Sequence, residues 1–152
     1  MVKRGQIRPI ALCIFRDEDR ILVFEGYDPV KGETYYRPLG GGIEFGEHSR
    51  ECIAREIREE LGAEIKDLTY VGMIENVFIC DGQPGHEIVL VYEANFVEQR
   101  LYDRKVIKGQ EDDGSEFIAL WKPVDEFRSE TARLYPEGLL DLLDGETTVL
   151  IE

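Results

Sequence analysis

The sequence contains few of the residues from which histidine or thiolate metal sites are built. Because His48 and His86 are its only histidines, a His-rich zinc site is not expected. Its three cysteines, Cys13, Cys52 and Cys80, form no C-x-x-C pair. Such a sparse, odd set is typical of free thiols in a reducing compartment.

Long apolar runs are also missing, since no segment approaches the length of a membrane span. Two basic residues lie near the start of the chain, but no long apolar segment follows them, so we expect no secretory signal. These absences predict a cytoplasmic protein.

Positive charge is scarce. The chain has 18 Lys and Arg against 32 Asp and Glu, which gives a formal net charge of −14. Such a chain repels nucleic acid polymers and anionic membranes, so we expect neither as a partner. If the substrate is a phosphate ester, its charge must be offset, and a bound divalent metal is the obvious candidate because oxygen-rich sites favour Mg²⁺ or Mn²⁺.

The 152 residues suit a single domain spanning residues 1–152, with no internal repeat or linker. The strand patterns, including a hairpin of 68–80 with 88–92 around a turn at 81–85, alternate with loops at 26–32 and 109–115. Helical patterns cover 49–61 and 136–143. Strands interleaved with helices predict an α/β (α+β) fold with a mixed sheet.

The predicted helix at 49–61 has one apolar stripe, formed by Ile53, Ile57 and Leu61. Gly62 fits a left-handed helix C-cap, a conformation that glycine enters without steric cost. This helix should therefore pack one side against the core and leave the adjoining side available.

Three carboxylates lie beside that stripe, because Glu56, Glu59 and Glu60 fall within roughly 100° of helical arc. Like charges at this spacing destabilise a helix and raise each other's pKa. A hard divalent cation removes both problems. An acidic helix face is also commonly just solvated, and that reading stays open for these residues alone.

The glycine run at 40–42 allows backbone conformations that are closed to other residues, so its main chain can approach a metal or a phosphate. Glu47 lies in the loop entering the helix, and Arg55 is placed to pair with it. Glycine runs are more often simple turns, but this one precedes the acidic helix.

The segment 41–63, GGIEFGEHSRECIAREIREELGA, resembles the Nudix box. The positions in register are Gly41, Glu47, Arg55, Glu56, Ile57, Glu59, Glu60 and Gly62. The resemblance implies an α/β/α sandwich with a mixed sheet. It also implies a divalent-metal-dependent pyrophosphohydrolase that cleaves a diphosphate linkage in a nucleoside di- or triphosphate, or in a nucleoside-diphosphate-linked compound.

The sequence departs from the family pattern at three places. Ala63 replaces a bulky aliphatic residue, and Leu39 takes a position commonly held by proline. His48 stands where a Ser or Thr cap is common, so Ser49 is an alternative N-cap.

By resemblance, the carbonyl of Gly40 and the carboxylates of Glu56, Glu59 and Glu60 would bind Mg²⁺ or Mn²⁺. Glu59 is also a candidate general base within the helix. Arg55 would pair with Glu47 or orient Glu59, which is a positioning role.

In other family members a glutamate of a late loop serves as the base or adds a metal ligand. The loop at 109–116 resembles that loop, with Glu111 as the first candidate and Glu116 as the second. A merely solvated acidic loop is the alternative.

A nucleotide-like small molecule is the expected substrate. Arg37 is a candidate phosphate ligand, and the main chain of Gly41 and Gly42 would approach the phosphates. Residues 75–76 and 86–87 flank the hairpin turn and should cluster if the strands pair. The aromatic residues able to stack on a base are Tyr27, Tyr35, Tyr36, Phe78 and Trp121.

Two other functions stay open on the same fold. One is a non-catalytic nucleotide sensor, against which the intact carboxylate set argues. The other is a diphosphate isomerase, which would need added acid–base machinery such as a cysteine. The resemblance leaves a homodimer open as well.

Overall fold

The computed structural model describes residues 5–129 and 131–145. The expectation of no secretory signal rests partly on residues 1–4, and these lie outside the described residues. The strands are β1 (Ile7–Asp17), β2 (Arg20–Asp28), β3 (Glu33–Arg37), β4 (Leu39–Gly42), β5 (Ile65–Cys80), β6 (Gln83–Phe96), β7 (Val106–Gln110), β8 (Glu116–Pro123) and β9 (Arg133–Leu134). The helices are α1 (Ser49–Leu61), the 3-10 turn η1 (Gln99–Tyr102), α2 (Val124–Arg128) and α3 (Leu139–Leu143).

The strands form a mixed sheet in the order β5-β6-β1-β2-β3-β9, with β4 paired to β1, β8 to β2 and β7 to β8. The β1–β6 and β3–β9 pairs are parallel, and the other pairs are antiparallel. The expected mixed sheet is therefore confirmed.

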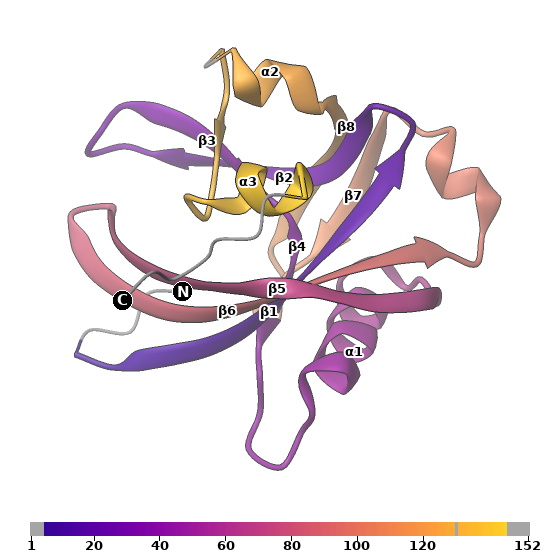
Figure 1. The fold of residues 1–152 in the computed structure, drawn as a ribbon, viewed down its shortest axis with the longest axis horizontal. Helices are drawn as coiled ribbons and strands as arrows, with labels where there is room; N and C mark the ends of the chain where they lie inside the picture. The colour runs from indigo at the N-terminus through magenta and orange to yellow at the C-terminus, as the bar shows by residue number, and fades with distance from the viewer. Residues whose placement is uncertain (1–4, 130, 146–152) are drawn as a thin grey trace.

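β1 lies between two apolar cores. In a strand, successive side chains point to opposite faces, and here both faces are buried. Ala11, Cys13 and Phe15 join the core that contains α1, whereas the alternating residues Ile10, Leu12 and Ile14 join the core that contains residues of α2 and α3. Helices thus cover both sides, as Figure 1 shows, which is the α/β/α layering expected from the resemblance.

The helix α1 begins after His48, which has the extended backbone of an N-cap. The Glu51 carboxylate accepts a hydrogen bond from the His48 backbone N–H at 3.0 Å. Ser49 is instead the first helical residue, and its hydroxyl is hydrogen-bonded to that of Tyr92. The alternative of Ser49 as the cap is therefore wrong, because that side chain is held by β6.

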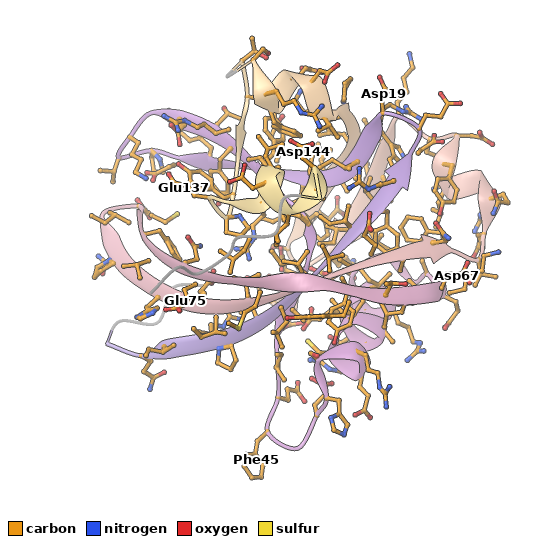
Figure 2. All side chains as sticks on the ribbon, in the orientation of Figure 1. Asp19, Phe45, Asp67, Glu75, Glu137 and Asp144 are labelled. Atoms are coloured by element: carbon orange, nitrogen blue, oxygen red, sulfur yellow. The ribbon has the colours of Figure 1, made fainter. Side chains whose placement is uncertain are left out.

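The end of α1 follows the sequence prediction. Gly62 takes a left-handed φ of 65°, and its N–H donates to the Arg58 carbonyl at 2.9 Å. Ile53 and Ile57 are fully buried, whereas the loop before the helix reaches into solvent. Phe45, near the tip of this loop, projects away from the molecule (Figure 2).

The predicted hairpin is present, but its turn is tighter than residues 81–85. Asp81 and Gly82 both have positive φ, which suits a two-residue turn matching the strand twist. β6 can therefore start at Gln83. Asn76 then faces Glu87 across the pair, so the expected clustering of residues 75–76 with 86–87 is confirmed.

Other element boundaries differ from the prediction as well. The expected loop 109–115 starts only at Glu111, because β7 continues to Gln110. The expected loop 26–32 is shorter, because β2 continues to Asp28 and β3 starts at Glu33. The expected helix 136–143 begins only at Leu139, since Gly138 takes a φ of 91°, which is incompatible with a helix.

Asp28 links the tips of the two hairpins. Its Oδ1 accepts hydrogen bonds from the backbone N–H groups of Val30 and Lys31, at 2.9 and 3.2 Å. Its Oδ2 accepts one from the N–H of Asp81, at 3.0 Å. These amides hold the pKa of Asp28 below its ordinary value, first of all the one from Asp81. Within the described ranges, every helix is too short or too polar to span a membrane.

Candidate active site

A cleft of about 660 Å³ lies where α1, β4 and the β7–β8 loop meet. Its acidic side is formed by Glu56 and Glu60 of α1 and by loop residues 111–113. Arg37 at the end of β3 and the glycine strand β4 also line it. The cleft therefore gathers carboxylates, a guanidinium and glycine backbone from four separate segments.

Arg55 organises the carboxylates of α1. It forms the expected ion pair with Glu47, with Nε to Oε2 at 2.7 Å and Nη2 to Oε1 at 3.0 Å. Its Nη1 donates to Glu56 at 3.0 Å and to Glu59 at 3.3 Å. The guanidinium also lowers the pKa of Glu47 to about 2. Arg55 is thus fully engaged within the protein, which fits a positioning role.

β4 needs glycine at two positions because atoms of neighbouring residues approach its backbone closely. Gly40 has a φ of 149°, and a Cβ there would lie 2.0 Å from the carbonyl oxygen of Ala11 on β1. A Cβ on Gly41 would lie 2.5 Å from the carboxyl carbon of Glu56. Any larger residue would therefore displace either the strand pairing or a carboxylate of the cleft.

Three carboxylates could share one cation. Glu56, Glu59 and Asp112 each offer an oxygen, and these oxygens lie within 4.8 Å of one another. Asp112 was missed from the sequence, although it directly follows the candidate Glu111 in the acidic loop. The sequence feature that indicates it is the run of acidic residues before Gly114, a glycine that turns the loop with a φ of 86°.

Glu60 is a second buried carboxylate of the cleft, beside Glu56. It is 8% exposed, and within the described part of the chain its Oε1 has no hydrogen-bond partner. Burial and the neighbouring Glu56 raise the pKa of Glu60 to about 9. Burial also raises the pKa of Glu56, although Arg55 opposes this.

This donor set fits a hard divalent cation. A buried carboxylate oxygen without a partner is costly, and Mg²⁺ or Mn²⁺ coordinates carboxylate oxygens readily. A cation would supply the missing partner and offset the mutual repulsion of the acids. Gly40 lines the same cleft.

The two candidate bases of the late loop are separated. Glu111 lines the cleft, in a loop closed by hydrogen bonds between its backbone and that of Ser115 and Gly114. Glu116 instead begins β8, pairs with Gln110 and does not line the cleft.

Adjacent residues of β3 point in opposite directions. Arg37 faces the cleft, with its guanidinium carbon 6.0 Å from the ring centre of Phe24. Tyr36 packs against the other core, near Phe127, and its hydroxyl donates to Glu25 at 2.9 Å. The structure therefore does not bring Tyr36 together with the other candidate substrate residues.

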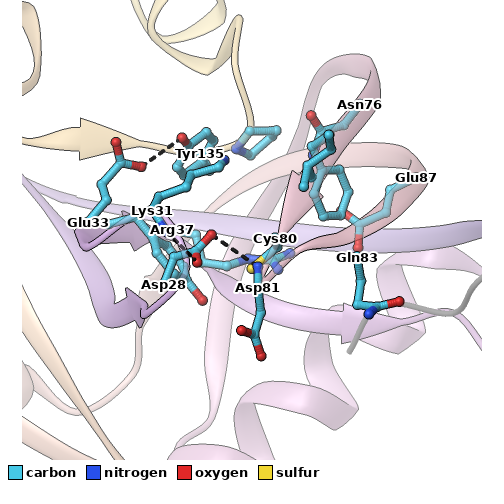
Figure 3. A pocket seen from close by; sticks show the side chains of 14 residues that line it. Asp28, Lys31, Glu33, Arg37, Asn76, Cys80, Asp81, Gln83, Glu87 and Tyr135 are labelled. Carbon is cyan, nitrogen blue, oxygen red and sulfur yellow. Dashed lines mark hydrogen bonds between the residues drawn. The ribbon is translucent and has the colours of Figure 1, made fainter.

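A second cavity of about 350 Å³ (Figure 3) adjoins the cleft. Arg37 lines both spaces. The second cavity lies between the β2–β3 and β5–β6 hairpins and is closed by Tyr135 and Pro136. Of the predicted stacking residues, Tyr35 and Phe78 line it. Its polar lining residues, such as Asn76 and Glu87, were anticipated only as a cluster beside the hairpin turn.

The remaining aromatic candidates lie elsewhere. Trp121 is buried in the core, where its indole N–H donates to the Leu101 carbonyl at 3.0 Å. Tyr27 is exposed and lines neither cavity.

No cysteine is placed as an acid–base group of the cleft. Cys52 is buried beneath the carbonyls of Gly41 and Gly42, and burial raises its pKa to about 12. Cys13 is buried in the core, and Cys80 lines the second cavity. The additional machinery that a diphosphate isomerase would draw from cysteine is therefore missing from this cleft.

Comparison with known proteins identifies a family model, the NUDIX domain, that matches residues 6–143. The NAD-capped RNA hydrolase NudC of Pseudomonas aeruginosa is 29% identical over 96 residues, which cover 63% of this chain and 32% of that protein. NudC of Mycobacterium tuberculosis is 38% identical over 69 residues, covering 44% and 21%. The matched part thus spans a third or less of these curated relatives.

Solved structures share the fold. A NUDIX hydrolase from Nitrosomonas europaea superposes with a TM-score of 0.64 at 17% identity, covering 95% of this chain and 94% of that one. A MutT NUDIX hydrolase from Burkholderia pseudomallei gives a TM-score of 0.59 at 21% identity, covering 80% and 86%. At these identities the likeness concerns the fold alone.

Proposed function

The chain belongs to the Nudix family as a pyrophosphohydrolase, and from this membership we propose that it uses Mg²⁺ or Mn²⁺ to cleave a diphosphate linkage. The substrate we propose is a nucleoside di- or triphosphate, or a nucleoside diphosphate joined to another group. One observation carries the proposal: Arg37 and the carboxylates of Glu56 and Glu60 line the same cleft. A bound cation and an arginine are the two groups that a diphosphate needs for its negative oxygens.

The cation would be held by the carboxylates of Glu56, Glu59, Glu60 and Asp112 and by the Gly40 carbonyl. When bound, a divalent metal polarises the phosphoryl group, offsets its charge and lowers the pKa of a coordinated water.

The residues of the chain have distinct tasks around the diphosphate. Arg37 binds a phosphate oxygen, and the backbone of Gly41 and Gly42 lets the phosphates approach the strand closely. Glu111, which lines the cleft, accepts the proton of the attacking water, with Glu59 as the alternative base. One phosphorus is attacked, and the bond to the bridging oxygen breaks.

Arg55 and Glu47 act through the other residues. Their ion pair fixes the start of α1 against the loop, while Nη1 of Arg55 holds Glu56 and Glu59 in place. Holding these groups before substrate binds reduces the reorganisation needed during the reaction.

The group attached to the diphosphate would occupy the second cavity, because Arg37 lines both spaces. The relatives named NAD-capped RNA hydrolase cleave a cap that contains a dinucleotide diphosphate, which keeps such compounds among the candidates. The net charge of −14 opposes binding of an RNA polymer, so we propose a small-molecule substrate.

The test is a substrate panel. The purified protein is incubated with Mg²⁺ or Mn²⁺ and nucleoside triphosphates, dinucleoside polyphosphates, NADH, ADP-ribose or nucleotide sugars, and products are identified by mass. We expect metal-dependent cleavage of one class. Cleavage should fall by orders of magnitude in Glu59→Gln, with thermal unfolding unchanged.

The matched control is Glu64→Gln, because Glu64 pairs with Arg58 beyond the end of α1 and lines neither cavity. Tight binding of a nucleotide without any cleavage would replace the hydrolase by the sensor function. Near-normal turnover of Glu59→Gln at saturating Mg²⁺ would remove Glu59 from the proposed metal site.

A further inference from the structure

Glu87 is a buried carboxylate at the second cavity. It is 4% exposed and lines the cavity from β6. Within residues 5–129 and 131–145, its side chain has neither a hydrogen bond nor an ion pair. Asn76 lies directly opposite on β5, lines the same cavity and likewise has no side-chain hydrogen bond to a described residue. Figure 3 shows the two side chains on the same side of the cavity.

Two acids across the cavity, Asp28 and Glu33, are already partnered. Asp28 accepts hydrogen bonds from three backbone amides. Glu33 accepts one from the Tyr135 hydroxyl at 2.9 Å and lies 3.4 Å from Nε of Arg133. Glu87 differs from them, because its carboxylate lines the cavity without a donor among the described residues and is therefore available to a ligand with N–H groups.

Building on the proposed function, we propose that Glu87 and Asn76 recognise the hydrogen-bonding edge of a guanine-type base on the substrate. A carboxylate offers acceptors only, while the Asn76 amide can donate to a carbonyl. A guanine edge presents two adjacent N–H donors, on N1 and on the 2-amino group, beside the O6 acceptor. Adenine lacks the N1 proton, and hypoxanthine lacks the 2-amino group.

The walls of the cavity suit a flat ring. Phe78 covers Gly85, so closely that a Cβ there would lie 2.4 Å from its Cζ. Tyr35 covers Gly26 in the same way and meets the Tyr135 ring edge-on at 5.8 Å between centroids. These neighbours hold the aromatic walls in place, and aromatic side chains stack on bases.

The size and position of the cavity also fit one base. Its volume of about 350 Å³ lies at the small end of ligand pockets, which suits a base better than a second nucleotide. Arg37 lines both the cavity and the cleft. A nucleotide whose base is held by Glu87 would therefore extend past Arg37 and place its phosphates near the carboxylates of the cleft.

The experiment compares kcat/KM for GTP, ITP and ATP at saturating Mg²⁺. We expect GTP to exceed both others by about tenfold or more, because a site built for hydrogen bonds discriminates against analogues that leave its groups unpaired. Glu87→Gln should lower kcat/KM for GTP by about tenfold and leave ATP nearly unchanged. Asn76→Asp, which places a second acceptor beside O6, should also abolish the preference.

The matched control is Glu75→Gln, because Glu75 is the neighbour of Asn76 on β5 but points to the opposite face and does not line the cavity. It should keep the wild-type preference. Thermal unfolding of each variant shows that it is folded; if Glu87→Gln is not, Asn76→Asp carries the test.

The outcomes separate this inference from the proposed function. Metal-dependent cleavage with equal kcat/KM for the three nucleotides, or a preference that survives in a folded Glu87→Gln, overturns the base recognition and leaves the hydrolase standing. If nothing is cleaved, calorimetry with GDP, IDP and ADP in Ca²⁺ decides: selective GDP binding supports the base recognition without the hydrolase. If the protein neither cleaves the nucleotides nor binds GDP selectively, the inference is overturned.

Discussion

Arg55 and Glu47 form a bidentate ion pair across the entrance to α1, with contacts of 2.7 and 3.0 Å, although they lie eight positions apart in the sequence. The pair is only partly exposed, with 23% of the Arg55 side chain and 14% of the Glu47 side chain accessible. The same guanidinium also donates to Glu56 and Glu59 of α1. Its planar shape therefore links the loop to the site.

Arg55→Lys should test this link. A lysine keeps the charge but cannot present the planar fork, so Glu47, Glu56 and Glu59 cannot all be held. We expect kcat to fall by about 10- to 100-fold, as for other losses of substrate or ligand positioning. Arg58→Lys is the control, because Arg58 makes a similar bidentate pair with Glu64 on an exposed surface. Equal effects of the two substitutions would contradict the positioning role.

Gly41→Ala should weaken metal binding. The added methyl group would lie 2.5 Å from the Glu56 carboxyl carbon, so this carboxylate must move. We expect the Mn²⁺ dissociation constant from calorimetry to rise about tenfold or more, in the range seen when the support of metal ligands is lost. Gly42→Ala is the matched variant for this readout, since its methyl group meets only the flexible end of Arg8. Unchanged Mn²⁺ affinity in Gly41→Ala would show that Glu56 is not a ligand.

The loop carboxylates should differ in their effects. Glu111→Gln should lower kcat by about 100- to 10,000-fold if Glu111 is the general base, with little change in metal affinity. Asp112→Asn should instead weaken Mn²⁺ binding, because Asp112 lies with Glu56 and Glu59. Glu116→Gln should leave both quantities unchanged, since Glu116 begins β8 outside the cleft. A loss of activity confined to Glu116→Gln would reverse this assignment.

The stability of the metal-free protein should fall as the pH rises. The pKa of Glu60 goes from its ordinary 4.5 to about 9 in the folded state, through burial and the neighbouring Glu56. Between these values the folded state retains a proton that the unfolded state releases, so the free energy of unfolding declines with increasing pH. Urea unfolding from pH 5 to 9 measures this decline.

Glu60→Gln provides the comparison, because it removes the titrating group and should flatten the pH dependence relative to the wild type. Saturating Mg²⁺ should restore the stability that the wild-type protein loses at high pH, since a ligand that binds the folded state stabilises that state. If wild type and variant lost stability in parallel between pH 5 and 9, Glu60 would not be the group responsible.

The sequence predicted those parts of the molecule that are encoded locally. The bounds of α1 and its Gly62 cap follow from periodicity and from glycine's access to left-handed backbone, and the Arg55–Glu47 pair follows from their placement at the start of the helix. The β5–β6 hairpin could also be predicted, because its turn residues lie between two apolar runs that are adjacent in the sequence.

The parts of the structure that depend on contacts between distant residues could not be predicted from the sequence. The parallel pairing of β1 with β6 joins strands that are far apart in the chain. The face to which Tyr36 points depends on the register of β3, and a shift of one residue would have exchanged it with Arg37. The approach of Asp112 to α1 is set by the packing of the β7–β8 loop, which no local pattern reveals.

Every residue of β1 from Ile10 to Phe15 packs into one of the two cores, since all six side chains are at most 1% exposed and alternate between these cores. β4 is registered on the same strand, with Gly40 opposite Leu12. Inserting or deleting one residue here would exchange the two faces and shift the glycines relative to α1. Homologous sequences should therefore vary in this segment by exchange of similar aliphatic residues and hold its length constant. The register of a strand that contributes no carboxylate to the cleft thus governs the spacing of the acids.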